Sequence, residues 1–312
     1  MAIVRTDIPI TAENCEQMIL EIVEKYPFCR TEVIGTTAYG RQLRTLVMGN
    51  GPRKVIYSAS HHANEWITSL VLLKFAEDLA QAISDQGVVF GVDAQKIADT
   101  ATIYMVPMVD PDGVDLVTGA IPPGSIPYEA ARILSEFYPS IPFPNGWKAN
   151  LLGVDLNLQY PAGWLQAREI KFSQGFTRPG PRDYVGRSPL NQLESRAMAG
   201  YTEFIDPALV LAYHAQGEVI YWQFKDYDIP GARELAEAFA RVSGYAVEET
   251  PFESSFAGYK DWFIQNFRRP GYTIEVGQGE SPLPLSQFDK IYADNLGILV
   301  IAALGDNTLS IP

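Results

Sequence analysis

Two of the three histidines in this 312-residue chain stand side by side, in the stretch SASHHANEW at residues 58–66. Glu65 follows His62 by three residues, so both side chains can face one point on a forming helical turn. The third histidine, His214, closes the apolar run ALVLAYHA. Two imidazoles and a carboxylate suit Zn²⁺, and three protein ligands leave a fourth position open for water. The chemistry that these residues predict is metal-assisted.

A further carboxylate lies in a run that should be buried. Glu275 stands among apolar neighbours in YTIEVG, residues 272–277. Burying a carboxylate costs several kcal/mol unless it is paired or functional, and a glutamate near an activated water can act as general base. Each signal is weak alone, because a histidine near a strand end is more often a hydrogen-bonded structural residue. His61 should point away from its neighbour's site, since adjacent residues in an extended segment face opposite sides.

The elements that must position these residues alternate between short apolar runs and longer amphipathic segments. Most runs are apolar on both faces, which is typical of strands buried between helix layers. Ligands bind at the carboxyl ends of strands in such sheets. Interleaved strands and helices therefore predict an α/β layered domain. The expected strands are 43–48, 54–60, 101–108, 208–215, 219–224 and 272–277, and the expected helices are 12–25, 66–83, 191–205, 231–243, 258–267 and 286–304.

Two long segments rich in proline and glycine, 118–147 and 160–190, interrupt this pattern. Irregular segments of this length in a compact domain are either binding or lid loops or plain surface connections. The sequence favours neither interpretation over the other.

The composition excludes several classes of function. The chain carries 24 basic and 37 acidic residues, a net charge of −13, and no basic stripe, so nucleic acid is not an expected partner. No apolar run reaches the ~18 residues of a membrane span, and no membrane contact is expected. The first residues lack the layout of a secretory signal, which predicts a cytoplasmic protein. Cys15 and Cys29 have no CxxC spacing, which excludes a thiolate zinc site and favours two reduced thiols.

Taken together, the motifs HHANEW, VPMVDPDG, WKAN followed by GVDLN, YHAQG and YTIEVG occur in one order along the chain. In this order the sequence resembles the zinc carboxypeptidases of the carboxypeptidase A type. The resemblance covers nearly the whole chain, including the early IGTTAYGRQL. It implies a single catalytic α/β domain over residues 1–312, with a mixed, roughly eight-stranded twisted sheet flanked by helices.

The resemblance also implies roles for individual residues. His62, Glu65 and His214 match the ligands of one Zn²⁺ per chain. Glu275 matches the general acid/base, and Lys148 matches the basic residue that stabilises the developing oxyanion. The implied mechanism is amide hydrolysis, in which zinc polarises the carbonyl and lowers the pKa of its water to ~7.

The segment GVDLNLQYPAGW matches the family's substrate-holding asparagine at Asn157 and then departs from the pattern. Carboxypeptidases place next an arginine that grips the free C-terminal carboxylate, whereas this chain has Leu158. Because leucine cannot bind a carboxylate, the site should not demand a free C-terminus directly after the scissile bond. Alternatively, Arg268 or Arg269 in FRRPGYTIE rebuilds the anchor.

Two more positions are expected to contact substrate. The family's mobile tyrosine falls by ungapped counting on Glu253, and Tyr259 is the nearest tyrosine. The floor of the specificity pocket falls on Lys260, which either pairs with the distal carboxylate of diaminopimelate or is a solvated surface lysine. Asp155 is a candidate for ordering the ring nitrogen of a metal ligand.

The segments DLNLQYPAGW and EVGQGESPLPLSQFDKIYADN resemble the bacterial γ-D-glutamyl-L-diamino acid endopeptidases. These enzymes cut the γ-D-glutamyl–diaminopimelate bond of peptidoglycan stem peptides, so the expected partner is a peptide or muropeptide substrate. No LysM wall-binding module is seen in the chain, which favours soluble fragments over intact wall. Two alternatives stay open: an ordinary metallocarboxypeptidase with a rebuilt carboxylate anchor, and a catalytically inactive muropeptide binder.

Overall fold

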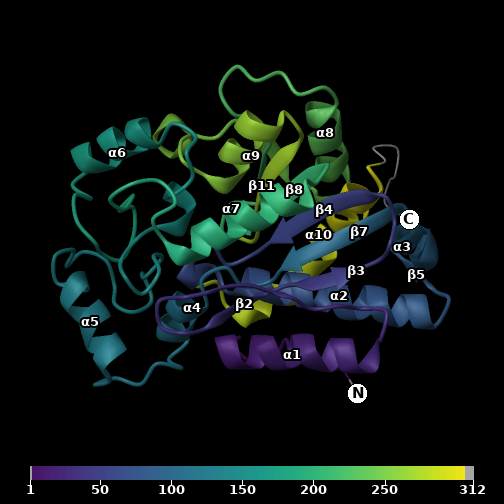
Figure 1. Ribbon diagram of the computed structural model, residues 1–312, viewed down its shortest axis with the longest axis horizontal. Coiled ribbons are helices and arrows are strands. Elements are labelled where there is room, and N and C mark those ends of the chain that lie inside the picture. Colours follow the sequence, from purple (N-terminus) through teal and green to yellow (C-terminus); the bar gives the residue numbers. More distant parts are fainter. Residues whose placement is uncertain (1, 306–312) are drawn as a thin grey trace.

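A mixed sheet of seven strands forms the centre of the protein in a computed structural model that describes residues 2–305 (Figure 1). The strand order is β10-β9-β11-β8-β4-β7-β3. The four central strands run parallel, while β9 and β3 pair antiparallel with β11 and β7. The strands are β3 (Leu46–Met48), β4 (Arg53–Ser58), β7 (Ala101–Val106), β8 (Leu209–His214), β9 (Val219–Tyr221), β10 (Ala246–Glu248) and β11 (Gly271–Glu275).

The sheet has seven strands, where the resemblance implied roughly eight. The expected strand 43–48 is interrupted at Thr45, and its first half, β2 (Gln42–Arg44), pairs with β1 (Val33–Thr36) in a separate ribbon. A second ribbon joins β5 (Val88–Val89) and β6 (Val92–Asp93).

Two helical layers cover the sheet, because successive strand residues face opposite sides. In β4, Val55 and Tyr57 belong to one core and Ile56 to the other. The first core lies under α2, α3, α8 and α10, with α1 outside α2, and the second lies under α7 and α9 (Figure 1). The helices are α1 (Ala12–Lys25), α2 (Ile67–Ser84), α3 (Ala94–Thr100), α4 (Pro111–Val117), α5 (Ile126–Ser135), α6 (Trp164–Ser173), α7 (Leu193–Ile205), α8 (Ala232–Ser243), α9 (Tyr259–Phe267) and α10 (Phe288–Leu304).

The α/β class and every expected helix and strand core are confirmed, with bounds that shift by a few residues. The two segments expected to be irregular, 118–147 and 160–190, contain one helix each, α5 and α6. Both Cys15 and Cys29 are buried and free. Within residues 2–305, every helix is too short or too polar to span a bilayer.

Candidate metal centre and substrate cavity

The predicted metal ligands meet at the carboxyl edge of the sheet. His62 follows the end of β4, Glu65 ends the short 3₁₀ turn Ala63–Glu65, and His214 is the last residue of β8. Because β4 and β8 are adjacent and parallel, their carboxyl ends lie side by side. The ligand atoms of the three residues all lie within 4.8 Å of one another, and all three side chains are buried.

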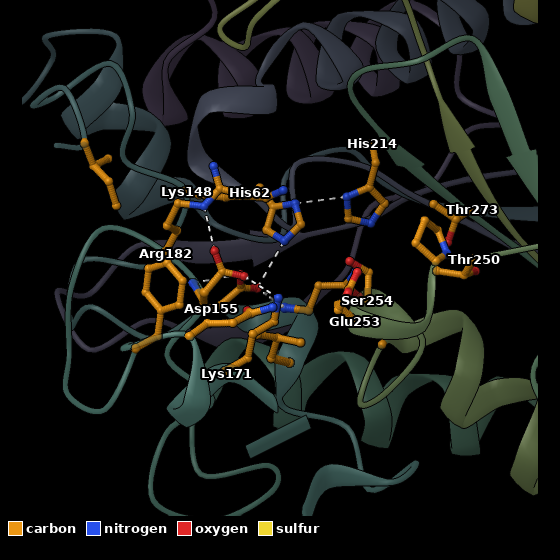
Figure 2. Close-up of a pocket in the computed structure, with 18 of the residues that line it drawn as sticks. His62, Lys148, Asp155, Lys171, Arg182, His214, Thr250, Glu253, Ser254 and Thr273 are labelled. Carbon is orange, nitrogen blue, oxygen red and sulfur yellow. Dashed lines mark hydrogen bonds and ion pairs between the residues drawn. The ribbon is translucent and has the colours of Figure 1, made fainter. Parts of the chain in front are cut away.

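The protonation of this group fits a divalent cation. The two histidine Nδ1 atoms are 3.0 Å apart, and each lies 2.9–3.0 Å from an oxygen of Glu65. The Nε2 of His62 faces Asp155 Oδ1 at 3.1 Å (Figure 2). Asp155 can therefore accept the Nε2 proton, and the Nδ1 lone pair of His62 is left facing the same space as His214 and Glu65. Two nitrogens and one carboxylate are a donor set that zinc prefers.

Neighbouring charges keep the two carboxylates of the group ionised. Burial opposes the charge of Glu65, but His62, Lys148 and His214 hold its pKa well below the ordinary value. Burial likewise opposes the charge of Asp155, yet His62, Lys148 and Lys171 keep its pKa far below that of a free aspartate. Burial lowers the pKa of His214. Burial also opposes the charge of His62, but Glu65 and Asp155 raise the pKa of that imidazole, so a cation would have to displace its proton. An anionic carboxylate beside a neutral imidazole is the state that a cation requires of its ligands.

Glu275 lies beside the metal ligands because strand register places it there. It is the last residue of β11, directly opposite His214 of the parallel strand β8. Its carboxyl lines the cavity described below. Burial and the negative charge of Glu65 raise the pKa of Glu275 to about 8, while Lys148 and His62 act in the opposite direction. A carboxyl with this environment can exchange a proton near neutral pH.

Lys148 approaches the same group from the loop after α5. Its Nζ lies 3.1 Å from Glu65 Oε1. The backbone N–H groups of Lys148 and Ala149 both donate to the carbonyl of Pro181, at 2.7 and 2.8 Å, which fixes this loop against the segment after α6. The cationic side chain is thus held next to the metal ligands, where it can stabilise negative charge on a reacting carbonyl oxygen.

A cavity of about 860 Å³ opens from the ligand group. In Figure 2, Lys148 and Arg182 lie to the left of the two histidines, and Thr250 and Thr273 lie to the right. We call the first side the basic end, defined by Lys148, Lys171 and Arg182, and the second the β11 end, defined by Thr250, Glu253, Thr273 and Glu275.

Asn157 and Leu158 stand on the short 3₁₀ turn Leu156–Leu158 and both line the cavity. The Oδ1 of Asn157 accepts a hydrogen bond from the backbone N–H of Tyr259 at 3.0 Å. Leu158 is 8% exposed and packs in the second core. Its position in the wall leaves an apolar surface where the family's arginine would stand.

Lys260 is a buried wall residue rather than a solvated surface lysine. It is 4% exposed, and it lines the cavity. Its Nζ donates to the carbonyl of Gln223 at 2.7 Å and pairs with Asp261. A lysine with this burial is paired before substrate arrives, so it presents a polar contact rather than an isolated charge.

The structure corrects two of the predicted substrate contacts. Tyr259 is fully buried, its ring stacks on His61, and its hydroxyl bonds Thr202 at 2.8 Å, so this side chain is part of the core and not of the cavity wall. Arg269 lies at the opposite end of the strand from Glu275 and is held by Asp206 at 2.7 Å and by the carbonyl of Pro207. It does not line the cavity. Tyr259 therefore cannot act as the mobile tyrosine, and Arg269 cannot rebuild the missing carboxylate anchor from this position.

Several wall residues were missed by sequence reasoning because no motif marks them. Arg182, Asp183 and Lys171 come from the segment 160–190. Glu253, on which ungapped counting placed the family's mobile tyrosine, lines the cavity from the 3₁₀ turn Phe252–Ser254. The only signal was the Pro- and Gly-rich composition that made 160–190 a candidate binding loop. Asp155, predicted to order the ring of a metal ligand, contacts Nε2 of His62 at 3.1 Å.

The two irregular segments interlock at the rim of the cavity. The ring of Tyr138 stacks on Phe176 with centroids 5.7 Å apart, and its hydroxyl donates to the carbonyl of Arg178 at 2.8 Å. The same ring packs on Gly180, where an added Cβ would lie 2.1 Å from a ring carbon. Only glycine permits this approach, so the contact between the segments depends on residue 180.

Fold and site together are those of a single-domain α/β hydrolase with a possible metal site at the carboxyl edge of its sheet. Residues 15–297 match the family model described as zinc carboxypeptidase, and the chain belongs to this family.

Two bacterial relatives share most of the chain. It is 43% identical to γ-D-glutamyl-L-diamino acid endopeptidase 1 of Lysinibacillus sphaericus over 284 residues, which are 90% of this chain and 69% of that protein. It is 38% identical to the uncharacterized protein YqgT of Bacillus subtilis strain 168, over 91% of this chain and 74% of that one.

Solved structures agree with the fold. Bovine thrombin-activatable fibrinolysis inhibitor, in complex with tick carboxypeptidase inhibitor, has a TM-score of 0.73 at 16% identity and covers 96% of this chain and 97% of its own. The murein-tripeptide amidase MpaA of Escherichia coli O157 has a TM-score of 0.52 at 17% identity, over 86% of this chain and 91% of its own. At these identities the likeness extends to the fold and not to the substrate.

Proposed function

We propose that the protein is a zinc-dependent peptidase that hydrolyses the γ-D-glutamyl–diaminopimelate bond of peptidoglycan-derived peptides. The observation that carries the proposal is the convergence of His62, Glu65 and His214 within 4.8 Å, flanked by Glu275 and Lys148 in one cavity. The name of the relative at 43% identity supports the choice of bond.

Each residue of the site has a separate role in the proposed hydrolysis. His62, Glu65 and His214 would hold one zinc ion per chain, which would polarise the amide carbonyl and lower the pKa of the attacking water. Glu275 accepts the proton of that water and passes it to the nitrogen of the leaving amine. Lys148 stabilises the charge that develops on the carbonyl oxygen. Asp155 fixes the ring of His62, so the ligand keeps its orientation during the reaction.

The wall at Leu158 supports a substrate other than a peptide with its free carboxylate directly after the cleaved bond. A carboxylate placed against this apolar surface would lose its hydration without a cation to pair with. Of the two predicted replacements, Arg269 is engaged with Asp206, Arg268 lies over the ring of Tyr227, and neither lines the cavity. Neither candidate anchor thus supports the ordinary carboxypeptidase. Lys260, at the cavity wall, is the proposed contact for the distal carboxylate of diaminopimelate.

The test uses zinc-loaded protein and two substrates, L-Ala-γ-D-Glu-diaminopimelate and a hippuryl dipeptide. Release of diaminopimelate, measured by chromatography, is the expected result, together with about one zinc per chain by metal analysis. Turnover of the hippuryl compound alone would replace the proposal with the ordinary carboxypeptidase. Binding of the tripeptide without cleavage by zinc-replete protein would make the chain a muropeptide binder.

A further inference from the structure

Among the cations of the cavity wall, the guanidinium of Arg182 has the most hydrogen-bond donors without a partner. Its Nε donates to Asp183 Oδ2 at 2.6 Å, and within residues 2–305 this is its one hydrogen bond. An arginine carries five N–H donors in a planar fork, so those on the two terminal nitrogens remain available. The side chain is 42% exposed and lines the cavity. By contrast, Lys148 is paired with Glu65, and Lys171 with Asp183.

The position of Arg182 is fixed by a chain of contacts that leads to the metal ligands. Asp183 lies between Arg182 and Lys171, whose Nζ is 2.7 Å from Asp183 Oδ1. The backbone N–H of Asp183 donates to Asp155 Oδ2, and Asp155 Oδ1 faces His62. Asp183 adopts φ +63°, a left-handed conformation that aspartate tolerates at some cost. The fork is thus held in place before any ligand arrives, which lowers the entropy lost on binding.

The unused N–H donors of Arg182 suit the basic end to an anionic ligand. Lys148, Lys171 and Arg182 stand there with the carboxylates of Asp155 and Asp183, and Glu65 adds a third carboxylate that is paired with Lys148. Lys148 and Arg182 lie on the same side of the two histidines in Figure 2. A planar arginine beside a second cation suits a carboxylate, which it can bind through two parallel hydrogen bonds.

The reaction assigns the basic end to the acyl side of the substrate. Glu275, which gives its proton to the leaving amine, lies at the β11 end. The leaving amino acid therefore extends toward Thr250 and Thr273, and the acyl group extends toward Lys148 and Arg182 (Figure 2). A γ-linked glutamyl group carries its free α-carboxylate on this acyl side, a short flexible chain away from the reacting carbon. An ordinary α-linked peptide has an uncharged amide in that place.

We infer that Arg182 binds the α-carboxylate of the γ-glutamyl residue and selects γ-linked acyl groups that carry a free acid. The inference rests on the proposed function and adds a specificity residue to it. It distinguishes D-glutamate from D-isoglutamine, in which the same carboxylate is an uncharged carboxamide. The arginine acts in substrate binding, so its loss affects KM more than kcat for the acid substrate.

The experiment compares L-Ala-γ-D-Glu-diaminopimelate with its α-carboxamide, L-Ala-γ-D-isoGln-diaminopimelate. Wild-type protein should cleave the acid with a kcat/KM about 10- to 100-fold higher, as expected for a charge-assisted contact. Arg182→Gln should lose most of this preference, with a much smaller loss on the carboxamide, whose continued turnover also shows that the variant is folded and loaded. Arg178→Gln is the matched control, because Arg178 belongs to the same segment, lies over the ring of Phe137 and does not line the cavity. It should keep the full preference.

The outcomes separate the inference from the function on which it rests. Equal preference for the acid in wild type and Arg182→Gln would overturn the role of Arg182 alone. An equal loss on both substrates in Arg182→Gln would do the same, since it would make the arginine structural. Wild-type protein that cleaves neither tripeptide would overturn the proposed function together with the inference.

Discussion

The cavity has two walls of different construction. One, the strand-end wall, consists of His62, His214 and Glu275 at the carboxyl ends of β4, β8 and β11. The other, the loop wall, consists of residues 137–141 and 171–183 from the two irregular segments. The strand-end residues are aligned by backbone ladders, whereas the loop residues are aligned by side-chain contacts and single hydrogen bonds. The difference places the predicted metal ligands and general base at the sheet edge and much of the substrate-facing surface on the loops, which the following experiments test.

The largest effect is expected at the strand-end wall. Glu275→Gln keeps the shape of the side chain and removes its capacity to accept a proton. The kcat for the tripeptide should fall by about 10²–10⁴-fold, the range for a general base, while zinc content stays unchanged. Steady-state kinetics and metal analysis measure the two quantities. A rate near that of the wild type would remove Glu275 from the chemistry.

A buried carboxyl outside both walls should make the stability of the fold depend on pH. Glu194 of α7 is buried against Asn150, and burial raises its pKa to about 7 from 4.5. Because the folded carboxyl holds its proton where the unfolded one has lost it, this residue lowers stability as pH rises from about 4.5 through 7. Between pH 4.5 and pH 8, the free energy of unfolding of Glu194→Gln should therefore fall less than that of the wild type, by up to about 3 kcal/mol. Urea unfolding at pH 4.5 and pH 8 measures it, with the exposed Glu203→Gln as control. Parallel pH profiles for wild type and Glu194→Gln would contradict the prediction.

The two walls meet at Asp155, which contacts both His62 and the backbone of Asp183. Asp155→Asn keeps the size of the side chain but weakens its hold on the Nε2 proton of His62. Zinc affinity should fall by about 10- to 100-fold, the usual effect of removing such a partner. Competition with a fluorescent chelator gives the dissociation constant. An unchanged constant would mean that the ring is oriented by packing alone.

The smallest effect is expected at Lys260. Wild-type protein should prefer diaminopimelate over lysine in the third position by about tenfold, since lysine lacks the distal carboxylate. The double variant Lys260→Met/Asp261→Asn removes the cation without leaving Asp261 unpaired, and it should cleave both tripeptides equally. Asp261→Asn alone is the control and should keep the preference. A double variant that retains the preference would place the diaminopimelate contact elsewhere.

The same division explains what the sequence could predict. The ligands were predictable because apolar runs such as 208–215 mark buried strands, and their polar end residues must gather at one edge of the sheet. Lys260 and Tyr259 are adjacent, yet one lines the cavity and the other packs inside, a distinction set by the rotation of α9 that local sequence leaves open. Arg182 was missed because its place depends on Asp183 and Lys171, contacts that no periodicity reveals. The helices α5 and α6 were missed because nearby prolines and glycines masked their short patterns.

The packing of Tyr138 on Gly180 and Phe176 limits how the two rim segments can be exchanged between related proteins. The two rim segments are about forty residues apart in the chain, yet neither surface is complete without its counterpart. Replacing only one segment with that of a homologue of different specificity would remove the packing partner of an aromatic ring. We therefore expect chimeras that exchange both segments together to stay folded. Chimeras that exchange only one segment should have a lower melting temperature, unless residue 180 stays glycine.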